Sequence, residues 1–139
     1  MAASTLSVRN LCVEIPTRNA VLRPVDEVNF DIAPGEILGV VGESGAGKSM
    51  TGNAVIGLLD RPAHISGGEI WLNGERIDHL DGEDMRRLRG RHIGMMFQDP
   101  LTSLNPLLTI GDQLRETIRE HLNVSDDEVS QRAIEGLKE

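Results

Sequence analysis

The sequence predicts an α/β domain decorated by a patch of antiparallel strands. Residues 36–42, EILGVVG, are a continuous apolar run of the kind expected for a central strand buried on both faces. The glycine-rich stretch ESGAGKS follows it, and MTGNAVIGLL, a plausible helix, comes next. Segments in which apolar and polar residues alternate flank this strand–loop–helix unit, and the whole order is typical of an α/β fold.

The flanking segments are predicted to be strands joined by tight turns. Apolar residues alternate with polar ones over 11–15 and 28–32, which is the pattern of a half-buried strand, and Pro34-Gly35 marks a turn. Within GEIWLNGERI, Asn73-Gly74 is the strongest short-range signal for a β-hairpin. The apolar stretch HIGMMFQ, residues 92–98, predicts a further strand with its two methionines and its phenylalanine in the core.

Helices are predicted in the second half by capping residues and by apolar spacing. Asp81 can cap a short helix that runs to Leu88 and ends at Gly90. Ser125 followed by Glu128 is the capping-box arrangement that starts a helix. Between these two helices, apolar residues at helical spacing mark an amphipathic helix: Leu107, Ile110, Leu114 and Ile118. The last helix is expected to repeat its apolar residues on one face: Val129, Ala133 and Leu137.

The composition limits the classes of protein to consider. The chain has 139 residues, room for one modest domain, and its 14 basic and 22 acidic residues give a net charge of −8. General nucleic-acid binding is disfavoured because it needs clustered Lys and Arg. Cys12 is alone, so no internal disulfide can form. No apolar run approaches the roughly 18 residues of a membrane-spanning helix, so any membrane connection is expected to go through a partner protein.

The strongest motif is GESGAGKS, which fits the phosphate-binding loop G-x-x-x-x-G-K-[ST] and has a predicted strand before it and a helix after it. Gly45 and Gly47 permit backbone angles closed to residues with a Cβ, so amide N–H groups can converge on phosphate oxygens. Lys48 brings a compact charge to the β- and γ-phosphates, and Ser49 offers its hydroxyl to the Mg²⁺ that bridges them. The predicted nucleotide-binding residues are Gly42, Glu43, Ser44, Gly45, Ala46, Gly47, Lys48, Ser49 and Met50. The loop alone indicates only a nucleoside triphosphate, because kinases, GTPases, motors and transport ATPases all use it.

A resemblance narrows this choice. The chain resembles the nucleotide-binding (ATPase) subunit of an ABC transporter in VDEVNFDIAPGEILGVVGESGAGKS, ISGGEIWLNGERI and IGMMFQDP. GESGAGKS together with FQDPLTSLNP resembles the oligopeptide, dipeptide and nickel importer branch, and the likeness covers nearly all of residues 5–125. It implies a P-loop NTPase core of the ABC ATPase type with an antiparallel β subdomain, truncated within the helical subdomain. The implied division of 1–139 is a β subdomain over about 1–100, with the Walker A loop and the Q-loop, and the start of the helical subdomain over 101–139.

The resemblance also implies site residues. The Q-loop glutamine of the family contacts Mg²⁺ and the attacking water, so Gln98 would act catalytically with Lys48 and share the metal with Ser49. The aromatic residue on which the family stacks adenine has no counterpart in TRNAVLRPV, where Asn19 or a neighbour would take its place. Leucines in and after the Q-loop are the best candidates for contact with a membrane subunit, with packing against the helix core as an equal alternative: Leu101, Leu104, Leu107 and Leu108.

One stretch is similar to a family motif but stands in the wrong place. Ser66-Gly67-Gly68 looks like the serine-glycine-glycine signature that grips a nucleotide across a dimer, yet it precedes Gln98 and runs into a predicted strand. We therefore interpret its glycines as serving a bend. No signature follows Gln98, and no apolar strand ending in paired acids does either. The switch histidine is missing too, and His121, on the amphipathic helix, is expected to be a surface or partly buried residue. The chain is interpreted as the first half of a nucleotide-binding domain, inactive by itself.

The function implied by the resemblance is ATP hydrolysis that powers the import of peptides, or of nickel, with ATP and Mg²⁺ as cofactors. The implied partners are transmembrane permease subunits, a second nucleotide-binding subunit and, indirectly, a substrate-binding protein, without nucleic acid. The implied place is the cytoplasmic face of the cell membrane, held there by the permease. A non-transport ABC ATPase of DNA repair or translation, and a regulatory fragment that binds without catalysis, remain open alternatives.

Overall fold

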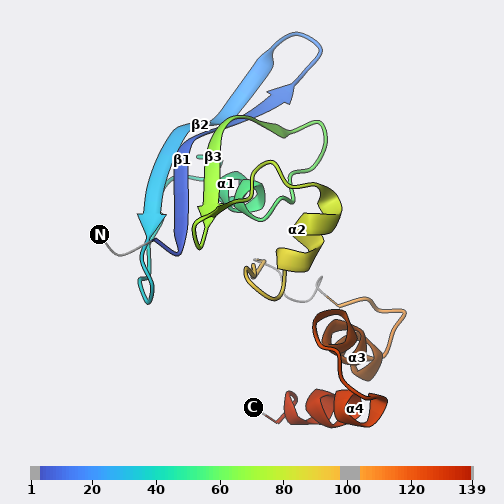
Figure 1. Cartoon of the computed structure of the whole chain (residues 1–139). Helices are drawn as coiled ribbons and strands as arrows, with labels where there is room; N and C mark the ends of the chain where they lie inside the picture. Colours follow the sequence, from blue (N-terminus) through green and yellow to red (C-terminus); the bar gives the residue numbers. More distant parts are fainter. Residues whose placement is uncertain (1–3, 98–103, 139) are drawn as a thin grey trace. The chain divides into compact units, whose positions relative to one another are not determined.

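The computed structural model describes residues 4–97 and 104–138. The chain divides into two compact units, Met1–Arg86 and Arg87–Glu139. The first unit contains four strands and helix α1, the second contains helices α3 and α4, and α2 (Gly82–Leu88) carries the chain from one unit into the other (Figure 1). The division predicted near residue 100 coincides with residues that are not described, and it stays a prediction.

The first unit is built on an antiparallel sheet with the strand order β2-β1-β3-β4. Figure 1 shows β2, β1 and β3 side by side. The predicted alternation over 11–15 and 28–32 is confirmed, since both stretches lie in long paired strands. The four strands are β1 (Leu6–Pro16), β2 (Val21–Ile32), β3 (His64–Leu72) and β4 (Glu75–Arg76).

The core of this unit lies between the sheet and helix α1 (Lys48–Val55), which contacts β2 and β3. Ala54 and Val55 on the last turn of α1 are buried. The most deeply buried side chains come from three strands: Val8, Leu11, Val13, Val25 and Ile70. The helix that begins at Lys48 is thus held against the sheet by apolar contacts, which fixes the position of its first turn.

The β3–β4 hairpin has the turn that its sequence predicts. Asn73 and Gly74 both take positive φ, 51° and 85°, as a two-residue turn with both central residues left-handed requires. Beyond the hairpin, Arg76 donates from Nε and Nη2 to the Asp78 carboxylate at 2.9 Å, and the Ile70 N–H donates to Asp78 Oδ1 at 2.9 Å. Burial raises the pKa of Asp78, but the hydrogen bonds from Arg76 and Ile70 outweigh it, so the pKa lies below 3.8.

Removal of the Asp78 charge is expected to destabilise the chain by about 1 kcal/mol, a modest amount because the Arg76 side chain is 38% exposed and water screens the pair. Since the folded-state pKa lies below the unfolded-state value, this stability is fully present above the unfolded-state pKa and is lost as the pH falls through the folded-state pKa. Urea unfolding of the wild type and Asp78→Asn at neutral pH and at about pH 2 checks the prediction. A stability difference that is the same at both pH values would contradict it.

The two glycines of the signature-like stretch lie inside β3 and face the backbone of β1. Gly67 is paired with Cys12, and a register shift separates this pair from the Arg9–Glu69 pair. Gly68 has φ 93°, and a Cβ there would lie 2.4 Å from the Asn10 carbonyl oxygen. The two glycines thus lie within the strand, whereas a bend leading into it was predicted, and the close approach of two backbones leaves no room for a side chain at Gly68.

The prediction of a buried strand over 36–42 is wrong. These residues are neither helix nor strand, and Ile37, Val40 and Val41 are 95%, 62% and 94% exposed. An apolar run buried on both faces needs a neighbouring strand on each side to satisfy its backbone N–H and C=O groups. Among residues 4–97 and 104–138, no strand pairs with this run. The turn predicted at Pro34-Gly35 is present, with Gly35 at φ 75°.

The strand predicted over 92–98 is not formed in its described part either. Residues 92–97 contain only an isolated bridge between Ile93 and Arg89, and Gln98 lies outside the described residues. Met96 and Phe97, predicted to be core, are 93% and 50% exposed. The reason is the same as for 36–42, since apolar composition alone cannot supply a pairing partner.

The predicted helices of the second half are present with their caps. Asp81 Oδ1 accepts hydrogen bonds from two N–H groups at the start of α2, and Gly90, at φ 76°, follows its end. The amphipathic helix is α3 (Ile110–His121), so the predicted Leu107 lies before it, and Thr109 is its N-cap. Ser125 caps α4 (Asp126–Glu135), as predicted.

Helix α4 packs against α3 through part of its predicted face. Val129 and Ala133 are 0% and 5% exposed, whereas Leu137 lies beyond the helix and is 65% exposed. Leu137 is therefore not part of the buried stripe that we predicted.

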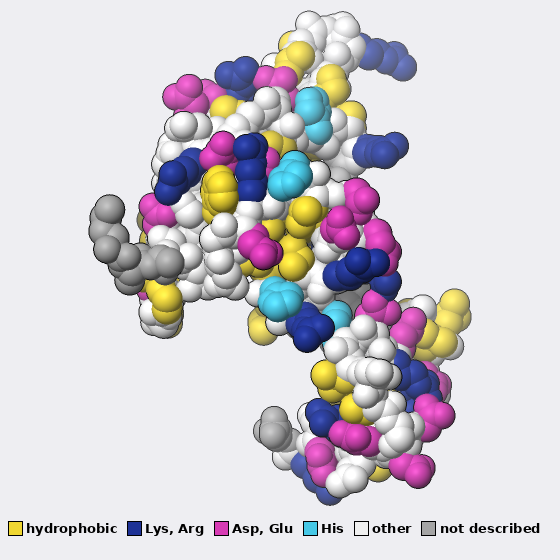
Figure 2. Space-filling view, in the orientation of Figure 1, with side chains coloured by type: hydrophobic (Ala, Val, Ile, Leu, Met, Phe, Trp, Pro, Cys, Tyr) yellow, Lys and Arg dark blue, Asp and Glu magenta, His cyan; other side chains and the backbone are white. Residues whose placement is uncertain are grey.

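Acidic and basic side chains are interspersed over the visible face of the molecule (Figure 2).

Candidate phosphate-binding site

The glycine-rich loop leads directly into helix α1, as the motif requires. The chain has no regular secondary structure over 36–43, turns at Ser44-Gly45 and enters the helix at Lys48. Gly45 and Gly47 have φ 83° and 82°, in the left-handed region that favours glycine. Two such residues around Ala46 bend the backbone so that the loop opens at the positive end of α1, where an anion is favoured.

Lys48 lies across its own loop. Its Nζ donates to the carbonyl oxygens of Gly42 at 2.7 Å and of Glu43 at 2.6 Å. An ammonium group carries three N–H donors, so these two bonds leave one for an oxygen of a bound phosphate. The positive charge is therefore already positioned beside the loop in the absence of a ligand. Phosphate binding then costs little conformational entropy of the Lys48 side chain.

Strand β2 contacts the loop at Gly47. A Cβ on Gly47 would lie 2.4 Å from the Pro24 carbonyl oxygen and 3.5 Å from Val25 Cγ2. A Cβ on Gly45 would meet nothing within 4 Å, so Gly45 faces open space. The sequence motif does not reveal this difference, because Pro24 and Val25 are distant in the chain and no local pattern marks their contact with Gly47.

The two glycines should therefore respond differently to substitution. Gly45→Ala costs only the left-handed backbone strain, about 1 kcal/mol. Gly47→Ala adds the clash with Pro24 and is expected to cost about 2 kcal/mol and to distort the loop. Urea unfolding and titration with a fluorescent ATP analogue should show Gly47→Ala to be the less stable and the weaker binder. If the two variants lost equal stability and equal affinity for the analogue, the contact between β2 and Gly47 would not be what supports the loop.

The other predicted residues occupy the loop and the first turn of α1. Ser49 is exposed and Met50 is half-buried on that turn. Glu43, Ser44 and Ala46 are exposed, and the Ala46 N–H donates to the Glu43 carbonyl oxygen at 3.2 Å. Gly42–Met50 thus form one continuous loop and the first turn of the helix. Gln98 lies outside the described residues, so its predicted place beside this loop stays a prediction.

Metal-binding capacity in this region rests on the Ser49 hydroxyl. No group of three or more His, Cys, Asp and Glu side chains that could hold a metal occurs in the described part of the chain. Mg²⁺ ordinarily takes one or two protein oxygens and completes its shell with phosphates and waters. An exposed Ser49 on the first turn of α1 fits that requirement where a nucleotide supplies the phosphates.

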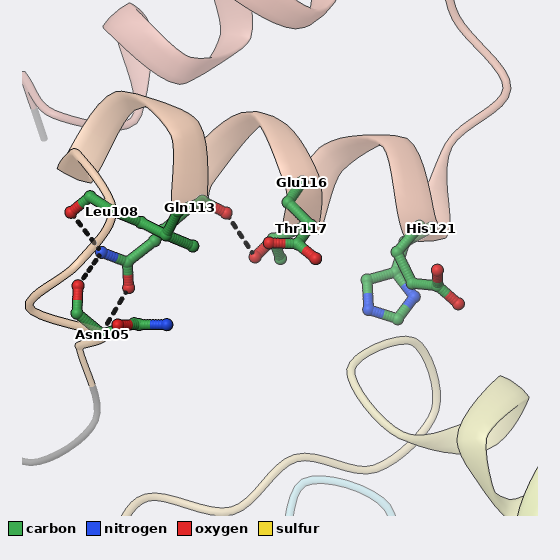
Figure 3. Close-up of a pocket in the computed structure, with 7 residues that line it drawn as sticks. Asn105, Leu108, Gln113, Glu116, Thr117 and His121 are labelled. Atoms are coloured by element: carbon green, nitrogen blue, oxygen red, sulfur yellow. Dashed lines mark hydrogen bonds between the residues drawn. The ribbon is translucent and has the colours of Figure 1, made fainter.

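An open pocket lies in the unit Arg87–Glu139, beside α3 (Figure 3). Gln113 and Thr117 line it from α3, and Asn105 and Leu108 line it from the preceding loop. His121 at its far end is half-buried, and a Cβ on Gly90 would lie 2.4 Å from the imidazole Nε2. The expectation that His121 is a surface or partly buried residue is confirmed.

Comparison with known proteins shows the family. The sequence profile described as ABC transporter matches residues 25–139. The chain belongs to the ABC transporter family. The phosphate loop and both units contribute to this match, and the resemblance inferred from sequence motifs is confirmed.

Several relatives in the ABC transporter family are named as import or transport ATP-binding proteins. A Brucella abortus (strain 2308) protein, named provisionally as a peptide import ATP-binding protein, is 44% identical over 135 residues. The dipeptide transport ATP-binding protein DppD of Escherichia coli (strain K12) is 37% identical, and the oligopeptide transport ATP-binding protein OppD of Bacillus subtilis (strain 168) 38% identical, each over 134 residues. These matches cover 97%, 96% and 96% of this chain but only 41%, 41% and 37% of the relatives. The chain therefore spans about two-fifths of the length of the curated relatives it matches.

Solved ABC cassettes share the fold. MJ0796, described as a bacterial ABC transporter cassette with a dimeric structure, aligns with a TM-score of 0.77 at 24% identity, over 96% of this chain and 56% of that one. Its dimeric post-hydrolysis state with bound ADP and Pi aligns with a TM-score of 0.76 over the same shares. The predicted α/β fold of the ABC ATPase type is thereby confirmed. None of the helices in the described residues has the length and apolar character needed to cross a bilayer.

Proposed function

We propose that this chain is the ATP-binding part of a subunit that powers ABC-type import of peptides, or of nickel, by binding and hydrolysing MgATP. The observation that carries the proposal is the phosphate loop, with the Lys48 ammonium held at its mouth by the carbonyls of Gly42 and Glu43. The names of the Brucella, DppD and OppD relatives support a peptide cargo. None of these three names favours DNA repair or translation.

Different residues of the loop bind different parts of the triphosphate. Backbone N–H groups from Gly45 to Ser49 bind the β-phosphate oxygens, helped by the positive end of α1. Lys48 donates its remaining N–H toward the γ-phosphate and stabilises the negative charge that grows as water attacks. Ser49 and Gln98 would hold Mg²⁺, which when bound neutralises charge between the β- and γ-phosphates. Gln98 would also orient the attacking water, as the resemblance implies.

Hydrolysis is proposed for a closed dimer attached to the membrane. The relatives are about two and a half times as long as the matched region, and a similar cassette, MJ0796, forms dimers. We propose a second nucleotide-binding subunit as the dimer partner and permease subunits as the membrane anchor, on the cytoplasmic face. A substrate-binding protein would deliver the cargo to the permease.

The proposal is tested by nucleotide binding and phosphate release with the 139-residue chain. A fluorescent ATP analogue should bind weakly in the presence of Mg²⁺, and ATP or inorganic triphosphate should displace it. Adenosine should not displace the analogue, because the phosphates dominate binding and no aromatic residue is available between β1 and β2 to stack the base. Phosphate release should be negligible, since no signature follows Gln98 in the sequence. Absence of any displacement by triphosphate would refute the proposed function, and robust turnover would refute the need for further residues.

A further inference from the structure

Helix α1 begins without the side-chain cap that α3 and α4 carry. Those two helices begin after Thr109 and Ser125, whose hydroxyls accept a hydrogen bond from an N–H group of the first turn, at 3.1 and 3.4 Å. The N-cap of α1 is Gly47, which has no side chain to accept such a bond. The N–H groups of residues 48–50 donate to no acceptor in the described part of the chain. These groups are open to an anion, but something other than a cap must fix their direction.

The backbone of Gly47 does not fix that direction by itself. Its ψ angle, 0°, sets the orientation of the peptide group that joins it to Lys48. Glycine has more backbone freedom than any other residue, so the residue type leaves this angle open. The close Pro24 carbonyl oxygen faces the position that a Cβ of Gly47 would take, and it makes no hydrogen bond to the peptide group beyond. The orientation of that peptide group therefore depends on another partner.

Thr51 is that partner. Its Oγ1 donates to the Gly47 carbonyl oxygen at 3.0 Å, and its backbone N–H donates to the same oxygen at 2.8 Å. Both lone pairs of the oxygen thereby have a donor. Thr51 is half-buried, so water competes less for this carbonyl than it does at a fully exposed helix end. The Gly47 C=O group is thus held pointing into α1, toward its second turn.

The direction of this C=O group decides where the Lys48 N–H points. In a planar trans peptide the C=O and N–H bonds point in opposite directions, and the Gly47–Lys48 peptide is trans. Because the Gly47 C=O points into the helix, the Lys48 N–H points out of its N-terminal end, where an anion is favoured. We infer that Thr51 is a positioning residue for phosphate binding: its hydroxyl holds the Gly47–Lys48 peptide so that the Lys48 N–H meets a phosphate oxygen. The inference rests on the proposed function, which assigns a triphosphate to this loop.

The same hydrogen bond occurs a second time in the chain and provides the control. Thr117 on α3 donates from Oγ1 to the Gln113 carbonyl oxygen, also at 3.0 Å (Figure 3). Gln113 lies inside its helix, whereas Gly47 is the N-cap of α1. A threonine that bonds back to the preceding turn does not strengthen a helix. Thr117→Val therefore reports the purely structural effect of removing such a bond, and Thr51→Val removes it beside the phosphate loop.

The measurement is the affinity for inorganic triphosphate, read from displacement of a fluorescent ATP analogue. Thr51→Val and Thr51→Ala should bind triphosphate roughly five-fold more weakly than the wild type, the effect of about one neutral hydrogen bond. Thr51→Ser keeps the hydroxyl, so it and Thr117→Val should stay within about two-fold of the wild type. The loss should be the same with Mg²⁺ and with a chelator, because Thr51 acts on a backbone amide and not on the metal. Thr51→Ala, with the best helix former, keeps the test valid if the branched valine disturbs the fold.

The outcomes separate the hydroxyl from the fold and from the proposed function. Wild-type affinity in Thr51→Ala would overturn the inference. So would an equal loss in Thr51→Ser, because the hydroxyl would then not be the group that acts, and so would a loss seen only with Mg²⁺. Urea unfolding of Thr51→Ala should show the wild-type midpoint or a higher one, and a lower midpoint would make the role of Thr51 structural. If triphosphate displaced no analogue from the wild type, the proposed function would be refuted and this inference with it.

Discussion

Lys48→Met is expected to weaken binding of a fluorescent ATP analogue by about 100-fold, the effect of losing a charged hydrogen bond to phosphate in a partly desolvated loop. The substitution also removes the bonds from Nζ to the Gly42 and Glu43 carbonyl oxygens, at 2.7 and 2.6 Å, so the loop loses the group that holds it closed. Both losses act on binding in the same direction. Titration in the presence of Mg²⁺ measures the effect.

The chain supplies its own control for charge. Lys138 is the other lysine in the sequence, so Lys138→Met makes the same change in net charge far from the loop in sequence. It should leave ATP affinity within about two-fold of the wild type, because Lys138 lies outside the loop motif and is exposed, so water and salt screen its charge. If Lys48→Met and Lys138→Met weakened ATP binding equally, the ammonium would be acting only through net charge, and the assigned site would be wrong.

Gly68→Ala is expected to destabilise the chain by about 3 kcal/mol, a large part of the 5–15 kcal/mol typical of a folded domain. Gly68 has φ 93°, and an added Cβ would lie 2.4 to 2.6 Å from three backbone atoms of Arg9 and Asn10. Backbone atoms in paired strands cannot turn aside as a flexible side chain can. The β1–β3 pairing must therefore open locally, and it holds the center of the first unit's sheet. The effect exceeds that predicted for Gly47→Ala, where one backbone atom lies under 3.0 Å.

The neighbouring glycine is the control for Gly68→Ala. A Cβ on Gly67 would have the Cys12 Cβ at 3.8 Å as its nearest neighbour, an ordinary van der Waals contact. Gly67→Ala should therefore change the free energy of unfolding by less than about 1 kcal/mol. Urea denaturation followed by circular dichroism compares the two variants. Similar stability of both would mean that the backbones of β1 and β3 lie further apart than the structure shows.

Local features of this protein could be read from residue type and short spacing. Asn73-Gly74 produces its turn, Asp81 and Ser125 cap their helices, and the loop from Gly42 to Ser49 bends at its glycines, as the sequence predicts. In each case the interacting groups lie within a few residues of one another, so few alternative conformations compete. The same stretches carry the likeness to the ABC transporter family. The fold class and the phosphate loop were therefore predictable from the sequence.

Only the tertiary structure decided which apolar segments are strands and what supports the site. The run over 36–42 has the composition of a central strand, yet its backbone groups have no neighbouring strand in the described residues, and Ile37 is 95% exposed. The contact of Gly47 with Pro24 and the bonds of Gln113 to the turn at Asn105 likewise join residues that no local pattern links. A residue's own preference acts at short range, whereas strand pairing and close backbone contact depend on what the rest of the chain brings alongside.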